Sequence, residues 1–163
     1  HRLLGEGHYA AVLKRAGDGP RAELPPEPAA KMPAELTQFC RQTGAQLPEG
    51  NLLLFGQVAY LVPQELPELK GLRVLRAGLE LGTILKNRLE PAHAWALWLP
   101  ELESSVSLPS GDAQLSRYLA GDVIPSPLRG WTLVRADGVS LGWAKGDGTQ
   151  LKNHYPKALR RPV

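Results

Sequence analysis

The C-terminal segment concentrates the residue types whose chemistry suits a polyanionic ligand. Residues 143–163 carry five lysines and arginines against Asp147 alone, a charge of +4, whereas the whole chain carries +3. Cationic side chains neutralise phosphates, side-chain amides recognise base edges, and aromatic rings stack on unpaired bases. The segment therefore predicts a nucleic-acid partner, and a solvated, frayed chain end is the alternative that charge alone leaves open.

Ten residues with complementary roles make up the predicted RNA-binding set. Gln150 and Asn153 present a donor and an acceptor together, and His154 and Tyr155 offer faces for stacking. In the alternative, Tyr155 and Leu151 pack into the domain while the lysines are solvated. The set is Trp143, Lys145, Gln150, Lys152, Asn153, His154, Tyr155, Lys157, Arg160 and Arg161. Four other cations are left unassigned, the last two in a turn best read as solvated: Arg73, Arg76, Lys86 and Arg88.

A β-hairpin must position this set. The stretches 131–136 and 139–145 flank Asp137-Gly138, a dipeptide that favours a two-residue hairpin turn. A ribbon with one buried face can hold charges in fixed places. Uninterrupted pairing outward from the turn predicts Ala136 with Val139, Val134 with Leu141 and Thr132 with Trp143 on one side. It predicts Arg135 with Ser140, Leu133 with Gly142 and Trp131 with Ala144 on the other.

Short helices and strands precede the hairpin and predict an α+β fold. Leu36, Phe39 and Cys40 share one face of a helix that starts at Pro33 and ends at Gly44, so Cys40 is interpreted as a structural thiol. Further strands are expected at 52–55, 57–62, 72–77 and 79–85, the last two separated by a kink at Gly78. Further helices are expected from Glu90-Pro91 to Pro100, with Trp95 and Trp98 in the core, and over 113–120, between an Asp112 cap and Gly121.

The remaining motifs argue against catalysis and metal binding. Four histidines lack metal-ligand spacing, one cysteine cannot build a zinc site, and the nucleophile elbow and the phosphate-binding loop are both missing. Gly146-Asp147-Gly148 is not followed by the glycine that would open a helix in a dinucleotide site. We therefore expect no catalytic residue, no metal and no cofactor in this chain. Its short apolar runs, single cysteine and lack of a leader predict no membrane partner and a cytoplasmic location.

Three stretches resemble one enzyme family. The segment GWTLVRADGVSLGWAKGDGTQLKNHYPKALRR, residues 130–161, is similar to the end of the RsmF-type RNA cytosine-5 methyltransferases of the Nop/Sun superfamily, and its KNHYPK run is specific. RAGLELGTILKNRLEPAHAWAL, residues 76–97, resembles the small domain before it. GEGHYAAVLKR, residues 5–15, resembles the last strand of the catalytic domain. Ala158 stands where we expect the family to have glycine.

The resemblance implies a division of the chain into four parts. They are a remnant strand of the upstream methyltransferase domain (1–16), a proline-rich linker (17–31), a small mixed α/β domain (32–100) and a PUA-like RNA-binding β pseudo-barrel (101–163). Without its sheet, the remnant is expected to be poorly ordered or to pair with another chain.

The resemblance also implies a function. The chain would be an accessory region that positions structured ribosomal RNA for the catalytic domain of an S-adenosylmethionine-dependent methyltransferase. No catalytic residue carries over, because the family's nucleophile follows proline and Cys40 follows Phe39, so the chain alone is not expected to be an enzyme. The alternative is a structural or protein-interaction module that braces the catalytic domain without touching RNA.

Overall fold

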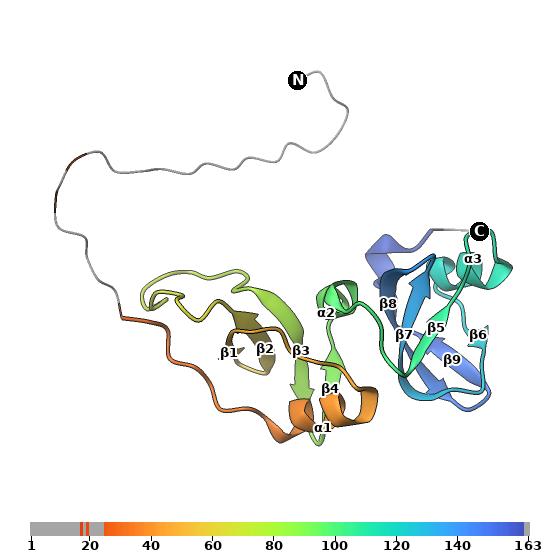
Figure 1. Cartoon of the computed structure of the whole chain (residues 1–163), viewed down its shortest axis with the longest axis horizontal. Helices are drawn as coiled ribbons and strands as arrows, with labels where there is room; N and C mark the ends of the chain where they lie inside the picture. The colour runs from red at the N-terminus through yellow and green to blue at the C-terminus, as the bar shows by residue number, and fades with distance from the viewer. Residues whose placement is uncertain (1–16, 18, 20–24, 162–163) are drawn as a thin grey trace.

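The computed structural model describes residues 17, 19 and 25–161, which form two small domains (Figure 1). The expectations for residues 1–16 therefore lie outside the described residues. The first domain contains α1 (Ala34–Thr43), β1 (Asn51–Phe55), β2 (Val58–Val62), β3 (Leu79–Leu85), β4 (Arg88–Pro91) and α2 (His93–Trp98). The second contains β5 (Ser105–Ser107), α3 (Ala113–Ala120), β6 (Ile124–Pro125), β7 (Arg129–Ala136), β8 (Val139–Asp147), β9 (Gln150–Asn153) and the 3₁₀ turn η1 (Lys157–Leu159).

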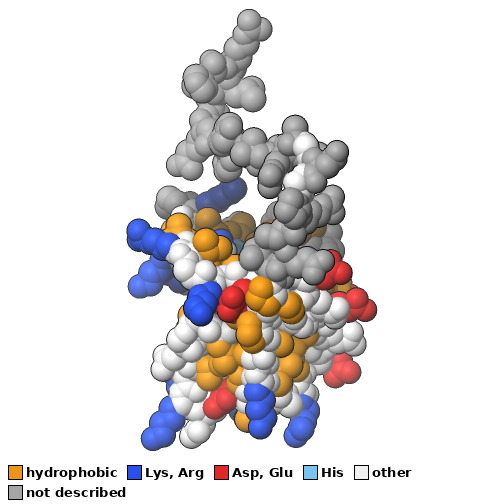
Figure 2. Space-filling view, turned by 90° about the vertical axis from the view of Figure 1, so that its left-hand side faces the viewer, with side chains coloured by type: hydrophobic (Ala, Val, Ile, Leu, Met, Phe, Trp, Pro, Cys, Tyr) orange, Lys and Arg blue, Asp and Glu red, His pale blue; other side chains and the backbone are white. Residues whose placement is uncertain are grey.

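The first domain is an antiparallel four-stranded sheet in the order β1-β2-β3-β4. Period-2 alternation gives the sheet two apolar faces: Leu52 and Leu61 join the main core with α1, whereas Leu53 and Tyr60 pack under the loop between β2 and β3. Figure 2 views the molecule from this end, where hydrophobic side chains gather among charged ones. Phe55, Leu72 and Leu75 are among the exposed apolar residues of this domain.

Helix α1 matches the sequence prediction closely. Pro33 lies at the N-cap, and Gly44 ends the helix in the left-handed conformation (φ 73°), which glycine adopts without strain. Cys40 packs against the core beside Phe39, and burial raises the pKa of its thiol. The interpretation of Cys40 as a structural thiol agrees with this environment.

Other predictions for the first domain are wrong. Residues 72–77 form no strand, because β3 already pairs with β2 on one edge and β4 on the other. Strand β4 was not predicted; it pairs with β3 across the two-residue turn Lys86-Asn87. Helix α2 therefore starts at His93, after the strand, rather than at Glu90-Pro91. Trp98, predicted in the core, is 46% exposed, whereas Trp95 is fully buried.

The described part of the proline-rich segment is bound to the first domain. Pro26 forms an isolated β-bridge with Pro67, and the amide of Glu27 donates to Leu66. The amide of Ala30 donates to the carbonyl of Leu52 at 2.7 Å. Backbone hydrogen bonds therefore hold the chain along the sheet before α1 begins.

The second domain is a curled, half-open barrel whose sheet has the order β5-β7-β8-β9-β6. Only β5 and β7 run parallel among its described strand pairs. Helix α3 covers one end with Tyr118 buried, and the Asp112 carboxylate caps it by accepting from the Gln114 amide at 2.7 Å. The predicted boundaries and caps of this helix are confirmed, as is the α+β class with a half-open sheet.

The β7–β8 hairpin has the predicted turn but a different register. Ala136 pairs with Val139 and Arg135 with Ser140, as predicted, but Val134 pairs with Gly142 because Leu141 is an extra, bulged residue. Beyond the bulge every predicted pair is shifted by one residue. The observed pairs are Val134 with Gly142, Leu133 with Trp143, Thr132 with Ala144 and Trp131 with Lys145.

The hairpin joins two hydrophobic cores. Leu133 and Trp143 belong to the core that the two domains share, together with Phe39 and Trp95. The opposite face of the hairpin contributes Val134 and Ala144 to the core inside the half-barrel. No helix within residues 25–161 is both long and apolar enough to cross a membrane.

Candidate nucleic-acid interface

Three strands place a row of side chains on one face of the second sheet. Trp131 of β7 pairs with Lys145 of β8, which pairs in turn with Lys152 of β9. Residues directly opposite each other in antiparallel strands project from the same face, so the indole and the two ammonium groups are neighbours. The Nζ of Lys145 lies 5.4 Å from the centroid of the Trp131 ring. The bulge at Leu141 produces this row, because uninterrupted pairing would place Ala144 opposite Trp131.

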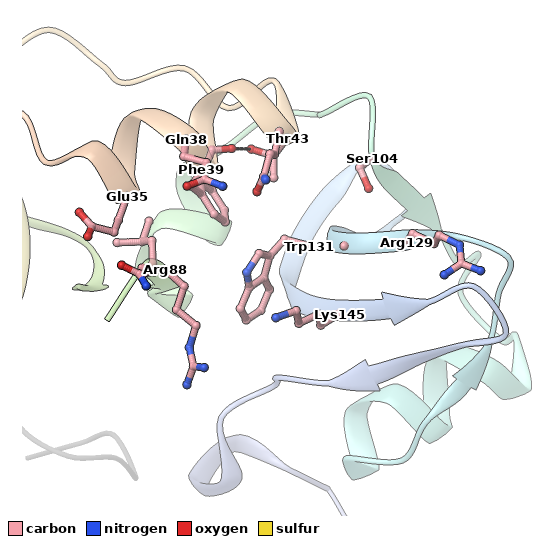
Figure 3. A pocket seen from close by; sticks show the side chains of 13 residues that line it. Glu35, Gln38, Phe39, Thr43, Arg88, Ser104, Arg129, Trp131 and Lys145 are labelled. Carbon is pink, nitrogen blue, oxygen red and sulfur yellow. Dashed lines mark hydrogen bonds between the residues drawn. The ribbon is translucent and has the colours of Figure 1, made fainter. Parts of the chain in front are cut away.

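The row borders a cleft of about 450 Å³ between the two domains. In Figure 3, α1 lies on one side, β7 and β8 lie on the other, and the indole of Trp131 is directed into the space between them. Arg88 reaches the cleft from β4, whereas Arg129 points away from the indole. The charged lining residues are Glu35, Arg88, Arg129 and Lys145. We call the part of the domain interface formed by Arg88, Trp131 and Lys145 the open end.

The remainder of the domain interface is closed by aromatic packing, and we call it the sealed end. Phe39 lies edge-on to Trp143 with their ring centroids 5.5 Å apart, and Trp95 lies 6.3 Å from the same ring. The indole Nε1 of Trp143 donates to the carbonyl of Ala92 at 2.9 Å. The hydroxyl of Ser140 donates to the carbonyl of Leu99 at 2.6 Å. These contacts fix the relative position of the domains and therefore the width of the open end.

The cations of the open end and of the strand row have no carboxylate partner among the described residues. Within this part of the chain the one ion pair joins Arg135 and Glu101, 2.9 Å apart. Arg88, Lys145 and Lys152 are all exposed. Their charges are therefore not neutralised inside the protein and face solvent.

Two members of the predicted RNA-binding set are structural instead. Trp143 is 1% exposed and cannot offer a ring face to a base. The side-chain amide of Asn153 donates to the carbonyls of Tyr118 and Asp122, and its oxygen accepts from the amide of Tyr155. Its hydrogen-bonding groups are engaged within the domain, so base recognition by Asn153 would require these hydrogen bonds to break.

The tail after β9 also uses part of its predicted set internally. The ring of Tyr155 lies 5.4 Å from that of Tyr118 and 5.5 Å from that of His93. The guanidinium of Arg160 donates from Nε and Nη2 to the carbonyl of Tyr155, at 3.3 and 3.2 Å. The alternative in which Tyr155 packs into the domain therefore describes this residue better than free stacking does.

The other predicted residues remain accessible but fall into two groups. Lys145 and His154 lie beside Trp131, with the His154 ring 4.5 Å from the indole, and Lys152 lies opposite Lys145 on the next strand. Lys157 and Arg161 are exposed in the tail after β9, where the amide of Arg161 donates to the carbonyl of Leu119 in α3. Gln150 is half-buried at the start of β9.

Histidine charge is suppressed at this surface. Burial lowers the pKa of His154, an effect that Lys145 strengthens and Glu90 opposes. Burial also lowers the pKa of His93, whose Nδ1 has no hydrogen-bond partner among the described atoms. Both imidazoles are therefore neutral at pH 7, and the positive charge of the surface comes from lysine and arginine.

Trp131 and Arg88 of the candidate site were not in the predicted RNA-binding set. The uninterrupted register paired Trp131 with Ala144, and Arg88 was interpreted as part of a solvated turn. The sequence signal for Arg88 was the alternation Arg88-Leu89-Glu90-Pro91, which is exposed and buried in turn, as in an edge strand. Arg73, also left open, lies in the loop between β2 and β3, at the opposite end of the long axis from β8 and β9 (Figure 1).

Neither a metal-ligand cluster nor a cofactor loop at Gly146-Asp147-Gly148 is found among the described residues. They contain no group of three potential metal ligands. The Gly146-Asp147-Gly148 turn connects β8 to β9, and the Asp147 carboxylate accepts from the amides of Thr149 and Gln150 within that turn. The hydrogen bond from the Thr149 hydroxyl, followed by those from the two amides, lowers the pKa of Asp147 to about 2. The Asp147 carboxylate is thus engaged within the turn itself.

Two family models match consecutive parts of the chain. Residues 38–99 match the first C-terminal domain of the RsmF rRNA methyltransferases, and residues 105–161 match the PUA domain of methyltransferase RsmF. These matches coincide with the two domains that share the aromatic core.

Individual relatives give the same result. The chain is 30% identical to the ribosomal RNA small subunit methyltransferase F of Aeromonas hydrophila subsp. hydrophila and to that of Shewanella sediminis, over 96% of this chain and 36% of each relative. The corresponding protein of Shewanella piezotolerans is also 30% identical, over 94% of this chain and 35% of its own length. The chain thus spans little more than a third of the curated relatives it matches.

Proposed function

Because the chain belongs to the C-terminal region of the RsmF rRNA methyltransferase family, we propose that it binds RNA and positions it for a methyltransferase domain upstream. The domain division at residues 32–100 and 101–163 belongs to this proposal. So does the parent activity, transfer of a methyl group from S-adenosylmethionine to a cytosine of ribosomal RNA in the cytoplasm. The isolated chain would bind RNA without methylating it.

The observation that carries the proposal is the cross-strand pair Lys145 and Lys152. Like charges directly opposite each other in a sheet repel, so this pair destabilises the free protein unless an anion lies between or above them. No carboxylate among the described residues fills that role. A phosphate backbone would neutralise both ammonium groups at once.

The position of Lys145 and Lys152 on paired strands supports binding at a fixed site. β8 is held by β7 on one side and β9 on the other, and Ala144 and Leu151 of β8 and β9 are fully buried beneath the lysines. The lysine stems therefore start from a rigid sheet rather than from a free chain end. Little backbone ordering is left to oppose RNA binding.

A salt titration tests the proposal. Fluorescence anisotropy of a labelled RNA hairpin, titrated with the whole chain between about 50 and about 200 mM KCl, is expected to show affinity that falls steeply with salt. Lys152→Ala with Lys157→Ala removes two accessible cations and is expected to reduce the slope of log K against log[salt] by about 1.4 to 1.8.

The matched control removes two cations far from the sheet. Lys70 and Arg73 are exposed in the loop between β2 and β3, so Lys70→Ala with Arg73→Ala changes the net charge equally. We expect this variant to bind nearly as the parent chain does. Affinity that is insensitive to salt, or an equal loss in both double variants, would contradict the proposal.

The bracing function is the second candidate, and one observation favours it. Leu97 and Trp98, adjacent on α2, are 55% and 46% exposed, an apolar surface that a neighbouring protein domain would bury. Substituting both by serine in the longer parent protein would then abolish methylation and leave RNA affinity of the C-terminal region unchanged. Unchanged methylation would count against this candidate.

A further inference from the structure

We propose that the cleft at the open end binds one unpaired nucleotide of the RNA, with its base against Trp131 and its phosphates at Lys145 and Arg88. The inference rests on the proposed function and deepens it. It makes the RNA surface a composite of both domains, because Arg88 belongs to the first and the other two residues to the second.

The first argument is the environment of the indole. Trp131 is half-buried and lines the cleft, and the rings of Phe39, Trp143 and His154 approach it at angles of 57°, 75° and 64°. None of these rings is parallel to the indole, so none is stacked on it face to face. Lys145 lies over the ring with a flexible side chain that can move aside to meet a phosphate.

The charged side chains of the cleft also support a nucleotide as the ligand. Arg88 and Lys145 enter the cleft from different domains, and neither has an ion-pair partner among the described residues. Glu35 on α1 is the one carboxylate in the lining. Two unneutralised cations beside a partly exposed aromatic ring match a nucleotide, which carries a phosphate on each side of a flat base.

The third argument is size and shape. A cleft of about 450 Å³ falls within the range of about 300–1,000 Å³ that is usual for small-molecule sites. A base in a duplex is covered on both faces by its neighbours, so only an unpaired base can lie against the indole. A carboxylate-rich peptide would satisfy the cations but would leave Trp131 without a flat partner.

The sealed end makes this cleft a preformed site. The Trp143–Ala92 and Ser140–Leu99 hydrogen bonds tie β8 to the segment around α2, so the two walls of the cleft are fixed relative to each other. A nucleotide therefore binds without having to order the walls, which lowers the entropic cost of recognition.

The experiment compares two probes of equal length, a labelled single-stranded RNA and a blunt RNA duplex, bound to the whole chain. Trp131→Ala is expected to weaken single-strand binding by about tenfold or more and to leave duplex binding nearly unchanged, because stacking is lost. Arg88→Ala is expected to lower the salt slope for the single strand by about 0.7. Arg76→Ala, an exposed arginine of the same domain outside the cleft, is the matched control.

A second variant covers the case in which Trp131→Ala fails to fold. Trp131→Phe keeps an aromatic ring but lacks the indole. The single-stranded RNA is therefore expected to quench tryptophan fluorescence in the parent chain and much less in this variant. The remaining tryptophans are Trp95 and Trp143, which are buried, and Trp98 on α2. Replacing the bases of the probe by abasic sites is expected to remove the quenching while salt-dependent binding persists.

The outcomes separate the two proposals. If the parent chain binds no RNA, the proposed function fails and this inference fails with it. If the parent chain binds RNA and Lys152→Ala with Lys157→Ala weakens it, but the Trp131 and Arg88 variants bind both probes like the parent, this inference alone is overturned. Equal weakening of single-strand and duplex binding by Trp131→Ala would also overturn it.

Discussion

The sealed end and the open end occupy the same face of β8, yet one is core and the other is surface. Trp143 and Lys145 are two residues apart and project to the same side of the sheet. Trp143 is covered because Phe39 and Trp95 fill the space above it. Above Lys145, α1 and β4 leave a cleft. The first domain, not the residue pattern of β8, decides which part of this face can meet a ligand.

The two ends of this domain interface therefore have different roles. Aromatic residues at the sealed end contribute buried area and hold the domains together. Trp131, a residue of the same type at the open end, contributes a partly exposed ring beside unneutralised cations. The comparison predicts that substitutions at the sealed end change stability, whereas substitutions at the open end change RNA affinity.

The largest expected effect is loss of stability on substituting the sealed end. Trp143→Ala removes a fully buried indole and leaves the carbonyl of Ala92 without its donor, so we expect a loss of about 3–5 kcal/mol in the free energy of unfolding. Urea denaturation measures it. Trp98→Ala, at 46% exposure, is the control and should cost about 0.5 kcal/mol. Similar losses in the two variants would remove the distinction between the two ends.

Asn153 tests the same distinction between structural and ligand-facing residues. An asparagine suits base recognition, whereas the observed contacts of Asn153 stabilise the domain. Asn153→Ala removes two donated hydrogen bonds and one accepted bond, so we expect a loss of about 1–3 kcal/mol in stability. RNA affinity, measured where the variant is still folded, should be unchanged. Lys152→Ala, the neighbouring exposed residue, should give the reverse result. A selective loss of RNA affinity in Asn153→Ala would reinstate it as a base-reading residue.

Features governed by the local backbone could be predicted from the sequence. Gly44 and Gly121 end helices in the left-handed conformation, and Asp112 caps α3 through an amide two residues away. The Asp137-Gly138 turn has positive φ at both residues, as its composition indicates. Each of these signals needs only a few consecutive residues to act, so one sequence contains all the necessary information.

Features that depend on distant partners could not be predicted. The bulge at Leu141 shifts the hairpin by one residue, and its local signal, Gly142 inside the strand, does not reveal which residue is left unpaired. The stretch 72–77 has strand-forming residues, but both edges of the neighbouring β3 are already occupied, by β2 and by β4. Arg88 and Trp131 meet only because the two domains pack on each other. The candidate site therefore contains Lys145 and Lys152, as predicted, together with Trp131 and Arg88, which were not predicted.

Acid is expected to lower the free energy of unfolding through two histidines. Burial lowers the pKa of His93 and of His154 in the folded state, while the unfolded chain keeps values near 6.5. The unfolded state therefore binds more protons, and stability is lost as the pH falls below about 6.5 and through the folded pKa values. Urea midpoints across about pH 5 to 7.5 measure this. His93→Gln with His154→Gln should flatten the curve, and an unchanged pH dependence would contradict the assignment.

The smallest expected change in stability comes from Lys145→Gln, at the centre of the open end. The variant loses a cation–π contact of about 0.5–1 kcal/mol at an exposed ring but also relieves repulsion with Lys152. The two effects oppose each other, so the free energy of unfolding should change by less than about 0.5 kcal/mol. RNA affinity should nevertheless fall, with the salt slope reduced by about 0.7 to 0.9. Lys70→Gln, with the same charge change on the distant loop, should leave both quantities unchanged, and a stability loss at Lys145 as large as that at Trp143 would mean that the cleft is part of the core.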